Sequence, residues 1–203
     1  MQDQQKDILK DSYDKHAHVR EKNAVQEWKI GPRKLFLELM KKEGKAALLD
    51  LGAGTGRDGC FFKGHGMDVT AIDLSGEMVK LCREKGIEAY ELDFYNLGSM
   101  HRSFDAVWAM NSLLHVGKNS LPSVLQEIKG VLKPSGLFFM GVYGGEDSEG
   151  IWEDDIYTPH RFFSFFTDEG VKAVVSRCFE LISFERIDTG GKYHFQSIIM
   201  RKE

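Results

Sequence analysis

Several features that would each point to a class of protein are scarce in this 203-residue sequence. The three cysteines, Cys60, Cys82 and Cys178, are scattered without the spacing of a metal site. No apolar run is long enough to span a membrane, and residues 1–22 are charged and polar, unlike a secretory signal. Because an odd cysteine count without a signal favours reduced thiols, we expect a cytoplasmic protein without a metal.

An excess of positive charge is also missing. The 27 Lys and Arg residues face 31 Asp and Glu residues, so the net charge is -4 and the pI about 6.0. No overall positive field recruits nucleic acid, which favours a small-molecule partner. The 42% hydrophobic content suits one core, and there is no repeat, low-complexity tract or linker. We therefore expect one domain over residues 1–203.

What the sequence does contain is an alternation of apolar strands and amphipathic helices. The predicted helices are residues 4–28, Lys34–Lys42 after a break at Gly31-Pro32, and three that begin near Arg57, Ser75 and Leu121. The predicted strands are Ala47–Asp50, Asp68–Asp73, Glu88–Leu92, Phe104–Ala109, Leu137–Tyr143 after a turn at Lys133–Gly136, and a closing hairpin of Leu181–Asp188 with Tyr193–Arg201. The pattern predicts an α/β three-layer sandwich: a seven-stranded, mostly parallel sheet with an antiparallel last strand and helices on both faces.

The most informative stretch is the strand Ala47–Asp50, which ends in an acid and runs into the glycine-rich turn Gly52–Gly56. Glycine permits the backbone angles of a sharp strand-to-helix turn and lets a ligand approach the main chain. The turn lies at the carboxyl edge of a parallel sheet, where such sheets bind ligands. It indicates a nucleoside cofactor. Asp50 before the first glycine, and a departure from the dinucleotide pattern, favour S-adenosylmethionine.

A second acid, Asp73, ends the next strand. Its two acceptor oxygens match the two hydroxyls of a ribose. The alternative is that Asp73 helps to cap the helix that begins at Ser75, and the two roles are compatible.

In order along the chain, these motifs resemble those of the class I S-adenosylmethionine-dependent methyltransferases, in particular small type 11 and type 12 members. The resemblance covers about Ala46 to Arg201 and rests on five segments: Asp50–Gly56, Asp73, Leu92–Phe94, Phe104–Ala109 and Leu132–Leu137. The closing hairpin also matches the family's strand order. The resemblance implies S-adenosylmethionine as the cofactor and methyl transfer by in-line displacement, in which the protein mainly aligns the reactants and excludes water.

The resemblance also implies a set of cofactor-binding residues. Around the methionine part and the ribose these are Tyr13, Asp50, Gly52, Ala53, Gly54, Asp73 and, through its backbone, Asn111; around the adenine they are Leu74, Met78, Asp93 and Phe94. Two roles have alternatives: Asp93 as a surface turn acid, and Tyr13 as a packing residue. Arg57 either reaches the cofactor carboxylate or is a solvated helix residue.

His115, after the fourth strand, is the candidate catalytic residue. An ordinary histidine pKa near neutral suits a general base for a hydroxyl or amine. The alternative is a structural histidine at a helix start.

Residues 1–45 are expected to form an N-terminal helical cap, and residues 144–166 an acceptor lid. In the lid, Trp152, His160 and Arg161 are candidates for substrate binding, with Arg161 pairing to a carboxylate or phosphate. His194 is a further pocket candidate. The alternative is a solvated loop, then aromatics that fill the core, then Thr167 as a helix cap.

The predicted function is transfer of a methyl group from S-adenosylmethionine to a small-molecule acceptor. One alternative is a tRNA-modifying enzyme of the wobble-uridine type, since some of these share the core and an arginine–aromatic segment before the final helix. Another is a non-catalytic partner subunit that binds the cofactor. The acceptor atom and the oligomeric state are left open.

Overall fold

The structure is a computed structural model that describes residues 2–24 and 26–203, with side chains from residue 4 onward. Val25, within the first predicted helix, lies outside the described residues. Among the described residues, no helix combines the length and apolar character needed to cross a membrane.

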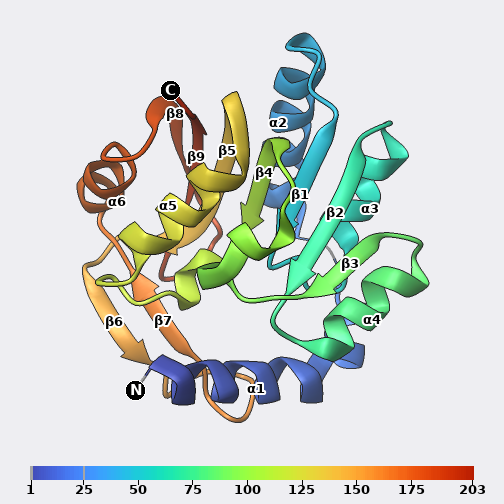
Figure 1. Cartoon of the computed structure of the whole chain (residues 1–203). Helices are drawn as coiled ribbons and strands as arrows, with labels where there is room; N and C mark the ends of the chain where they lie inside the picture. Colours follow the sequence, from blue (N-terminus) through green and yellow to red (C-terminus); the bar gives the residue numbers. More distant parts are fainter. Residues whose placement is uncertain (1, 25) are drawn as a thin grey trace.

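The main sheet has seven strands in the order β3-β2-β1-β4-β5-β9-β8 (Figure 1). Its strands are β1 Ala47–Leu51, β2 Asp68–Asp73, β3 Glu88–Glu91, β4 Phe104–Met110, β5 Leu132–Gly144, β8 Glu180–Ile187 and β9 His194–Arg201. All neighbours pair in parallel except β9, which runs antiparallel to both β5 and β8. The predicted sheet, including its antiparallel last strand, is confirmed.

Helices cover both faces of this sheet, and α1 runs along its carboxyl edge (Figure 1). The helices are α1 Gln2–Lys22, α2 Ile30–Lys42, α3 Arg57–Gly64, α4 Gly76–Glu84, α5 Leu121–Val131 and α6 Asp168–Val175, with 3-10 turns η1 Glu27–Lys29, η2 Phe94–Met100 and η3 Leu113–His115. Successive strand residues point to opposite faces. In β1, Leu48 packs with α2, α3 and α4, whereas Leu49 packs with α5 and α6. The sandwich of three layers follows from this alternation.

Three element boundaries differ from the sequence prediction. The first helix ends at Lys22, and Gly31-Pro32 lies inside the first turn of α2 instead of breaking a helix. Proline is tolerated there because the N–H it lacks has no partner within the helix. The predicted turn Lys133–Gly136 is a bulge within β5, where the pairing with β4 jumps from Leu132 to Leu137.

A small second sheet lies within the predicted lid. It pairs β6 Ser148–Ile151 with β7 Phe162–Phe165 in antiparallel register. Figure 1 shows α1 running past the carboxyl ends of β1, β2 and β4, beside β6 and β7. The two segments that sequence analysis assigned to a cap and a lid therefore meet at the ligand-binding edge of the sheet.

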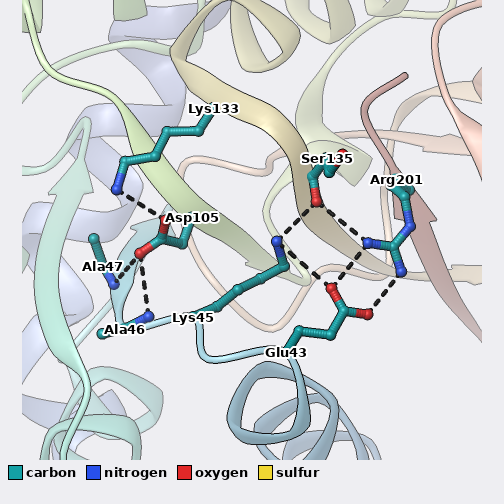
Figure 2. A network of polar contacts seen from close by, with 8 residues as sticks. All are labelled: Glu43, Lys45, Ala46, Ala47, Asp105, Lys133, Ser135 and Arg201. Carbon is teal, nitrogen blue, oxygen red and sulfur yellow. Dashed lines mark hydrogen bonds and ion pairs between the residues drawn. The ribbon is translucent and has the colours of Figure 1, made fainter.

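The opposite edge of the sheet is closed by a polar network (Figure 2). Glu43 accepts two hydrogen bonds from Arg201, at 2.7 and 2.9 Å, which ties the end of α2 to the end of β9. Asp105 at the start of β4 accepts from the backbone N–H groups of Ala46 and Ala47 and from Lys133. This network stabilises the edge of the sheet that lies opposite the carboxyl ends of the parallel strands, so it does not occupy the ligand-binding edge.

Candidate functional site

A cavity of about 740 Å³ lies at the carboxyl edge of the sheet. Its wall combines the turn after β1, the ends of β2, β4 and β5, the inner side of α1 and residues 152–165. The predicted site residues that line it are Tyr13, Gly52, Ala53, Gly54, Asp73, Leu74, Phe94, Asn111, His115, Trp152 and Arg161. A smaller space of about 90 Å³ adjoins it and shares Leu74, Phe94 and His115. The volume is in the range of small-molecule sites.

Four predicted site residues are not brought to the large cavity. Asp93 borders only the small adjoining space. Asp50 is buried behind the glycine turn, and Met78 is fully buried against Ala17 and Leu81, where α4 packs on α1. His160 is partly exposed and lines neither space.

His194, the further pocket candidate, lies outside both spaces as well. Its ring bonds to Asp168 at 2.7 Å, at the start of α6. This places His194 in a polar contact between β9 and α6.

Two positions of the turn require glycine, each for a different reason. Gly52 has φ 71°, and a Cβ there would lie 2.4 Å from Cβ of Ser112, so a side chain would push β1 and β4 apart. Gly54 has φ 54° and faces open space, with nothing within 4 Å of an added Cβ. The first glycine permits close packing, and the second leaves bare main chain on the cavity wall.

Asp73 is fixed by two backbone hydrogen bonds. Its Oδ2 accepts from the N–H of Gly54 at 2.8 Å, and its Oδ1 from the N–H of Ser75 at 2.9 Å. Each oxygen keeps a second lone pair for a ligand hydroxyl. Burial raises the pKa of this carboxyl, against the two backbone bonds. The side chain Oγ of Ser75 caps α4 through the N–H of Met78, so Asp73 and Ser75 share the helix start.

Asp50 sits below the turn as a buried, weakly satisfied acid. Its Oδ2 has no hydrogen-bond partner among the described residues. Burial, followed by repulsion from Asp58 and Asp73, raises the pKa of Asp50 well above its usual range. The carboxyl lies against Gly59, in the first turn of α3, so it supports the loop from behind.

Asp93 already has two partners from the protein. Its Oδ1 accepts from the N–H of Tyr95 and caps η2, and its Oδ2 pairs with Lys6 of α1 at 2.8 Å. Both carboxylate oxygens of Asp93 thus have partners within the protein, and its expected contact with the adenine stays a prediction. Lys6 also lies 4.3 Å from the centre of the Tyr95 ring, so α1 covers the small adjoining space.

His115 belongs to a chain of hydrogen bonds that links three elements. Its Nδ1 lies 2.7 Å from the carbonyl of Phe162 and its Nε2 lies 2.6 Å from Oη of Tyr13. A carbonyl only accepts, so Nδ1 carries the proton and Nε2 accepts from the tyrosine hydroxyl. Oη of Tyr13 in turn accepts from Arg161 at 2.9 Å.

The chain is anchored at Arg161. Two guanidinium nitrogens of Arg161 each bond Asp155 at 2.7 Å, and both side chains are nearly buried. Burial, followed by the positive charges of Arg161 and Arg20, lowers the pKa of His115 to about 3. At neutral pH, His115 is therefore uncharged and its free lone pair is held by Tyr13.

Two cations on the cavity wall escaped the sequence analysis. Arg20 lies 5.0 Å from the ring centre of Tyr13 and 5.4 Å from that of Tyr157, and Lys29 is the last residue of η1. Both side chains line the cavity. Burial lowers the pKa of Lys29, which makes an anionic ligand favourable there. The helical period alone did not show which face of α1 turns inward.

Arg57 lines the cavity and also supports the fold. Its Nη2 donates to the carbonyls of Arg20, at 3.0 Å, and Glu21, the two residues before the last residue of α1. Carbonyls at the end of a helix lack partners within it, so Arg57 caps α1 from the start of α3. The bond fixes the end of α1 over the cavity.

Comparisons with known proteins place this geometry in a family. The fold resembles 1,6-didemethyltoxoflavin-N1-methyltransferase of Burkholderia thailandensis, solved with 1,6-didemethyltoxoflavin and S-adenosylhomocysteine, with a TM-score of 0.77, 22% identity and coverage of 97% of this chain and 88% of the other. Residues 49–140 match the family described as methyltransferase domain. The chain thus carries a methyltransferase domain with the fold of the class I S-adenosylmethionine-dependent methyltransferases. The match begins inside β1 and ends inside β5 of this methyltransferase, so it spans the turn, Asp73 and Asn111.

Curated relatives of this methyltransferase act on different acceptors. The ubiquinone biosynthesis O-methyltransferase of Xanthomonas oryzae pv. oryzae is 34% identical over 102 residues, which cover 47% of this chain and 42% of the relative. The tRNA (carboxymethyluridine(34)-5-O)-methyltransferase of Arabidopsis thaliana is 28% identical over 110 residues, 51% of this chain and 26% of the relative. The matched region spans less than half of either relative.

The residues present in this methyltransferase fit the family cofactor. Gly54 leaves open space at the cavity wall, and Asp73 is oriented with free lone pairs. Arg20 and Lys29 supply positive charge near the turn. These groups suit a ligand with hydroxyls, a carboxylate and an ammonium.

Proposed function

We propose that the protein transfers the methyl group of S-adenosylmethionine to a small-molecule acceptor inside the large cavity. One observation carries the proposal: the cavity is continuous from Asp73 and Leu74, at the nucleoside end, to Trp152 and Tyr193, at the other. A cofactor and a second small molecule can therefore meet within one space. Bound S-adenosylmethionine supplies an activated methyl group, so the protein needs mainly to align and enclose the reactants.

In this proposal the chain's residues have separate tasks. Asp73 accepts from the ribose hydroxyls, while Arg20 and Lys29 attract the cofactor carboxylate. The helical cap of residues 1–45 and the lid of residues 144–166 exclude water. The Tyr13 hydroxyl, held between His115 and Arg161, closes the wall between cap and lid. Because the lone pair of His115 is occupied, a base role for His115 requires Tyr13 to pass the proton on.

The relative from Arabidopsis thaliana favours a second candidate, a tRNA acceptor. Two features support it: the match to this relative, and the buried Arg161 with the aromatic residues that follow it. Acidic residues around the lid, Asp147, Glu149 and Asp154, oppose a polyphosphate ligand. We favour the small molecule for this reason. The cytoplasmic location expected from the cysteine count stays a prediction.

The test is methyl transfer from radiolabelled S-adenosylmethionine into two matched pools. One pool is a metabolite extract that is filtered to molecules below about 1 kDa, the size range of small-molecule ligands. The other pool is bulk tRNA. Label in the extract alone supports the proposal, and label in tRNA alone replaces it with the second candidate. Calorimetry with S-adenosylhomocysteine runs beside it. If S-adenosylhomocysteine does not bind, both candidate functions are wrong.

A further inference from the structure

The part of the cavity wall that is formed by the lid and the closing hairpin is built from aromatic rings. Phe163 and Phe165 are parallel within 8° at 5.9 Å, and Phe165 and Tyr193 within 12° at 4.3 Å. Trp152 stands nearly perpendicular to all three, at 83–89° and 5.0–6.2 Å. All four line the cavity, and we call them the ring wall. They come from β7, the β6–β7 connection and the β8–β9 hairpin.

The ring wall combines buried and exposed rings. Phe163 and Phe165 are buried in the core, whereas Trp152 keeps 37% of its surface exposed and Ile156, which also lines the cavity, keeps 82%. Large apolar side chains that stay exposed beside a cavity mark a binding surface more often than a core. Flat ring faces and edges bind other aromatic rings in stacked or edge-to-face geometry. The wall therefore suits a planar ring.

Polar groups around the ring wall are already used by the protein. Oη of Tyr193 donates to Glu146 at 2.9 Å, and Oγ1 of Thr189 donates to the Tyr193 carbonyl at 2.6 Å. Lys192 pairs with Glu146 at 3.3 Å. A sugar or phosphate would have to break these contacts, so this part of the cavity wall favours an uncharged, apolar body.

A free acceptor atom lies where β4 ends. The carboxamide Oδ1 of Asn111 is buried, borders the cavity and has no hydrogen-bond partner among the described residues. Asn111 also holds φ 55°, a left-handed conformation that surrounding structure must support. A buried acceptor without a partner is costly unless a ligand supplies a donor. The favoured ligand therefore carries an O–H or N–H group.

We propose that the acceptor is a planar aromatic molecule with a hydroxyl or amino substituent, its ring on the ring wall and its donor group on Asn111. The proposal rests on the proposed function and names the substrate class of that site. It assigns Trp152 and Asn111 to specificity, one for ring shape and one for the donor.

The test compares aromatic compounds with ring-saturated partners. Catechol against cis-1,2-cyclohexanediol, and 4-aminophenol against trans-4-aminocyclohexanol, are titrated by ligand-observed NMR into protein saturated with S-adenosylhomocysteine. We expect at least about tenfold tighter binding of each aromatic compound, on the scale of stacking on one ring. Equal binding within the pairs, or no aromatic binding, overturns the proposal. Calorimetric binding of S-adenosylhomocysteine is the separate test of the proposed function.

Variants separate the two parts of the site. Trp152→Ala should weaken catechol about tenfold, Trp152→Phe should restore most of the binding, and both should keep their affinity for S-adenosylhomocysteine. Tyr90→Ala, at an exposed ring on β3 outside the cavity, is the matched control and should change nothing. Asn111→Gly keeps the left-handed backbone and should weaken catechol but not 1,2-dimethoxybenzene, which has no donor. Unchanged catechol binding in Trp152→Ala overturns the proposal.

Discussion

Asp73 is fixed by the fold and, in the proposed function, also binds the cofactor. Its backbone bonds to Gly54 and Ser75 fix both the cofactor turn and the start of α4. The carboxylate thus has little freedom to lose when a ribose binds. The same burial that orients it also raises its pKa, so its charged form is less favoured than in water.

Replacing Asp73 should therefore weaken cofactor binding. We expect Asp73→Asn to reduce the affinity for S-adenosylhomocysteine by ~1.5–3 kcal/mol, about 10- to 150-fold, the scale of a hydrogen bond to a charged group. Calorimetry measures it. Asp68→Asn, at the exposed start of the same strand, is the control. Unchanged affinity in Asp73→Asn would move the ribose contact to another residue.

His115 predicts a missing pH dependence. Because burial lowers the pKa of His115 to about 3, the ring is neutral on both sides of pH 6.5. Between pH 5 and 8, methyl transfer by the wild type and by His115→Gln should therefore depend on pH in the same way, because His115 does not titrate in this range. The measurement is the pH profile of kcat/KM for both proteins. An inflection lost only in the variant would restore the simple general-base role.

At the scale of elements, Asp155 and Arg161 form a buried pair within the lid, and Arg161 donates from this pair to Tyr13 of α1. Asp155→Asn would leave the Arg161 charge buried and less well paired. We expect the free energy of unfolding to fall by ~3 kcal/mol, at the low end for a broken buried pair. Urea unfolding measures the change. Asp154→Asn, next to it and exposed, should stay close to the wild type. Similar stability of both variants would mean that the lid gains nothing from the pair.

The network at the opposite edge of the sheet predicts acid sensitivity. Burial opposes ionisation of Asp105, but bonds from Lys133, Ala47 and Ala46 prevail and lower its pKa to about 2. A lowered folded-state pKa stabilises the protein above the unfolded value of about 3.9, and this contribution disappears as pH falls through 2. Asp105→Asn should therefore destabilise the protein at pH 7 and approach the wild type near pH 2. Urea unfolding at pH 7, 4 and 2.5 tests this. A gap between the two proteins that stays constant would contradict it.

For the whole molecule, local patterns predicted the strands of the main sheet, its closing hairpin and the glycine turn after β1. Gly52, Gly54 and Asp73 are recognisable because the turn and the strand ends depend on neighbours in the sequence. Arg20 and Lys29 are not, since their approach to the cavity depends on how α1 and η1 dock on a distant sheet edge. Met78 was assigned to the adenine, but its helix face turns toward α1. The short strand β6 escaped because four residues carry too little pattern. Around β7, Phe163 and Phe165 fill the core and Thr167 caps α6, in agreement with the alternative interpretation of this segment.

The position of β9 has a consequence for how this chain is made. β9 is the last strand in the sequence, yet it lies between β5 and β8 in the sheet. It also carries Arg201, the partner of Glu43. While a ribosome is still synthesising these residues, β5 and β8 both present unpaired backbone edges. The sheet can close only after residue 201 has left the exit tunnel. Until then, nascent chains carry two strand edges that invite pairing with other chains.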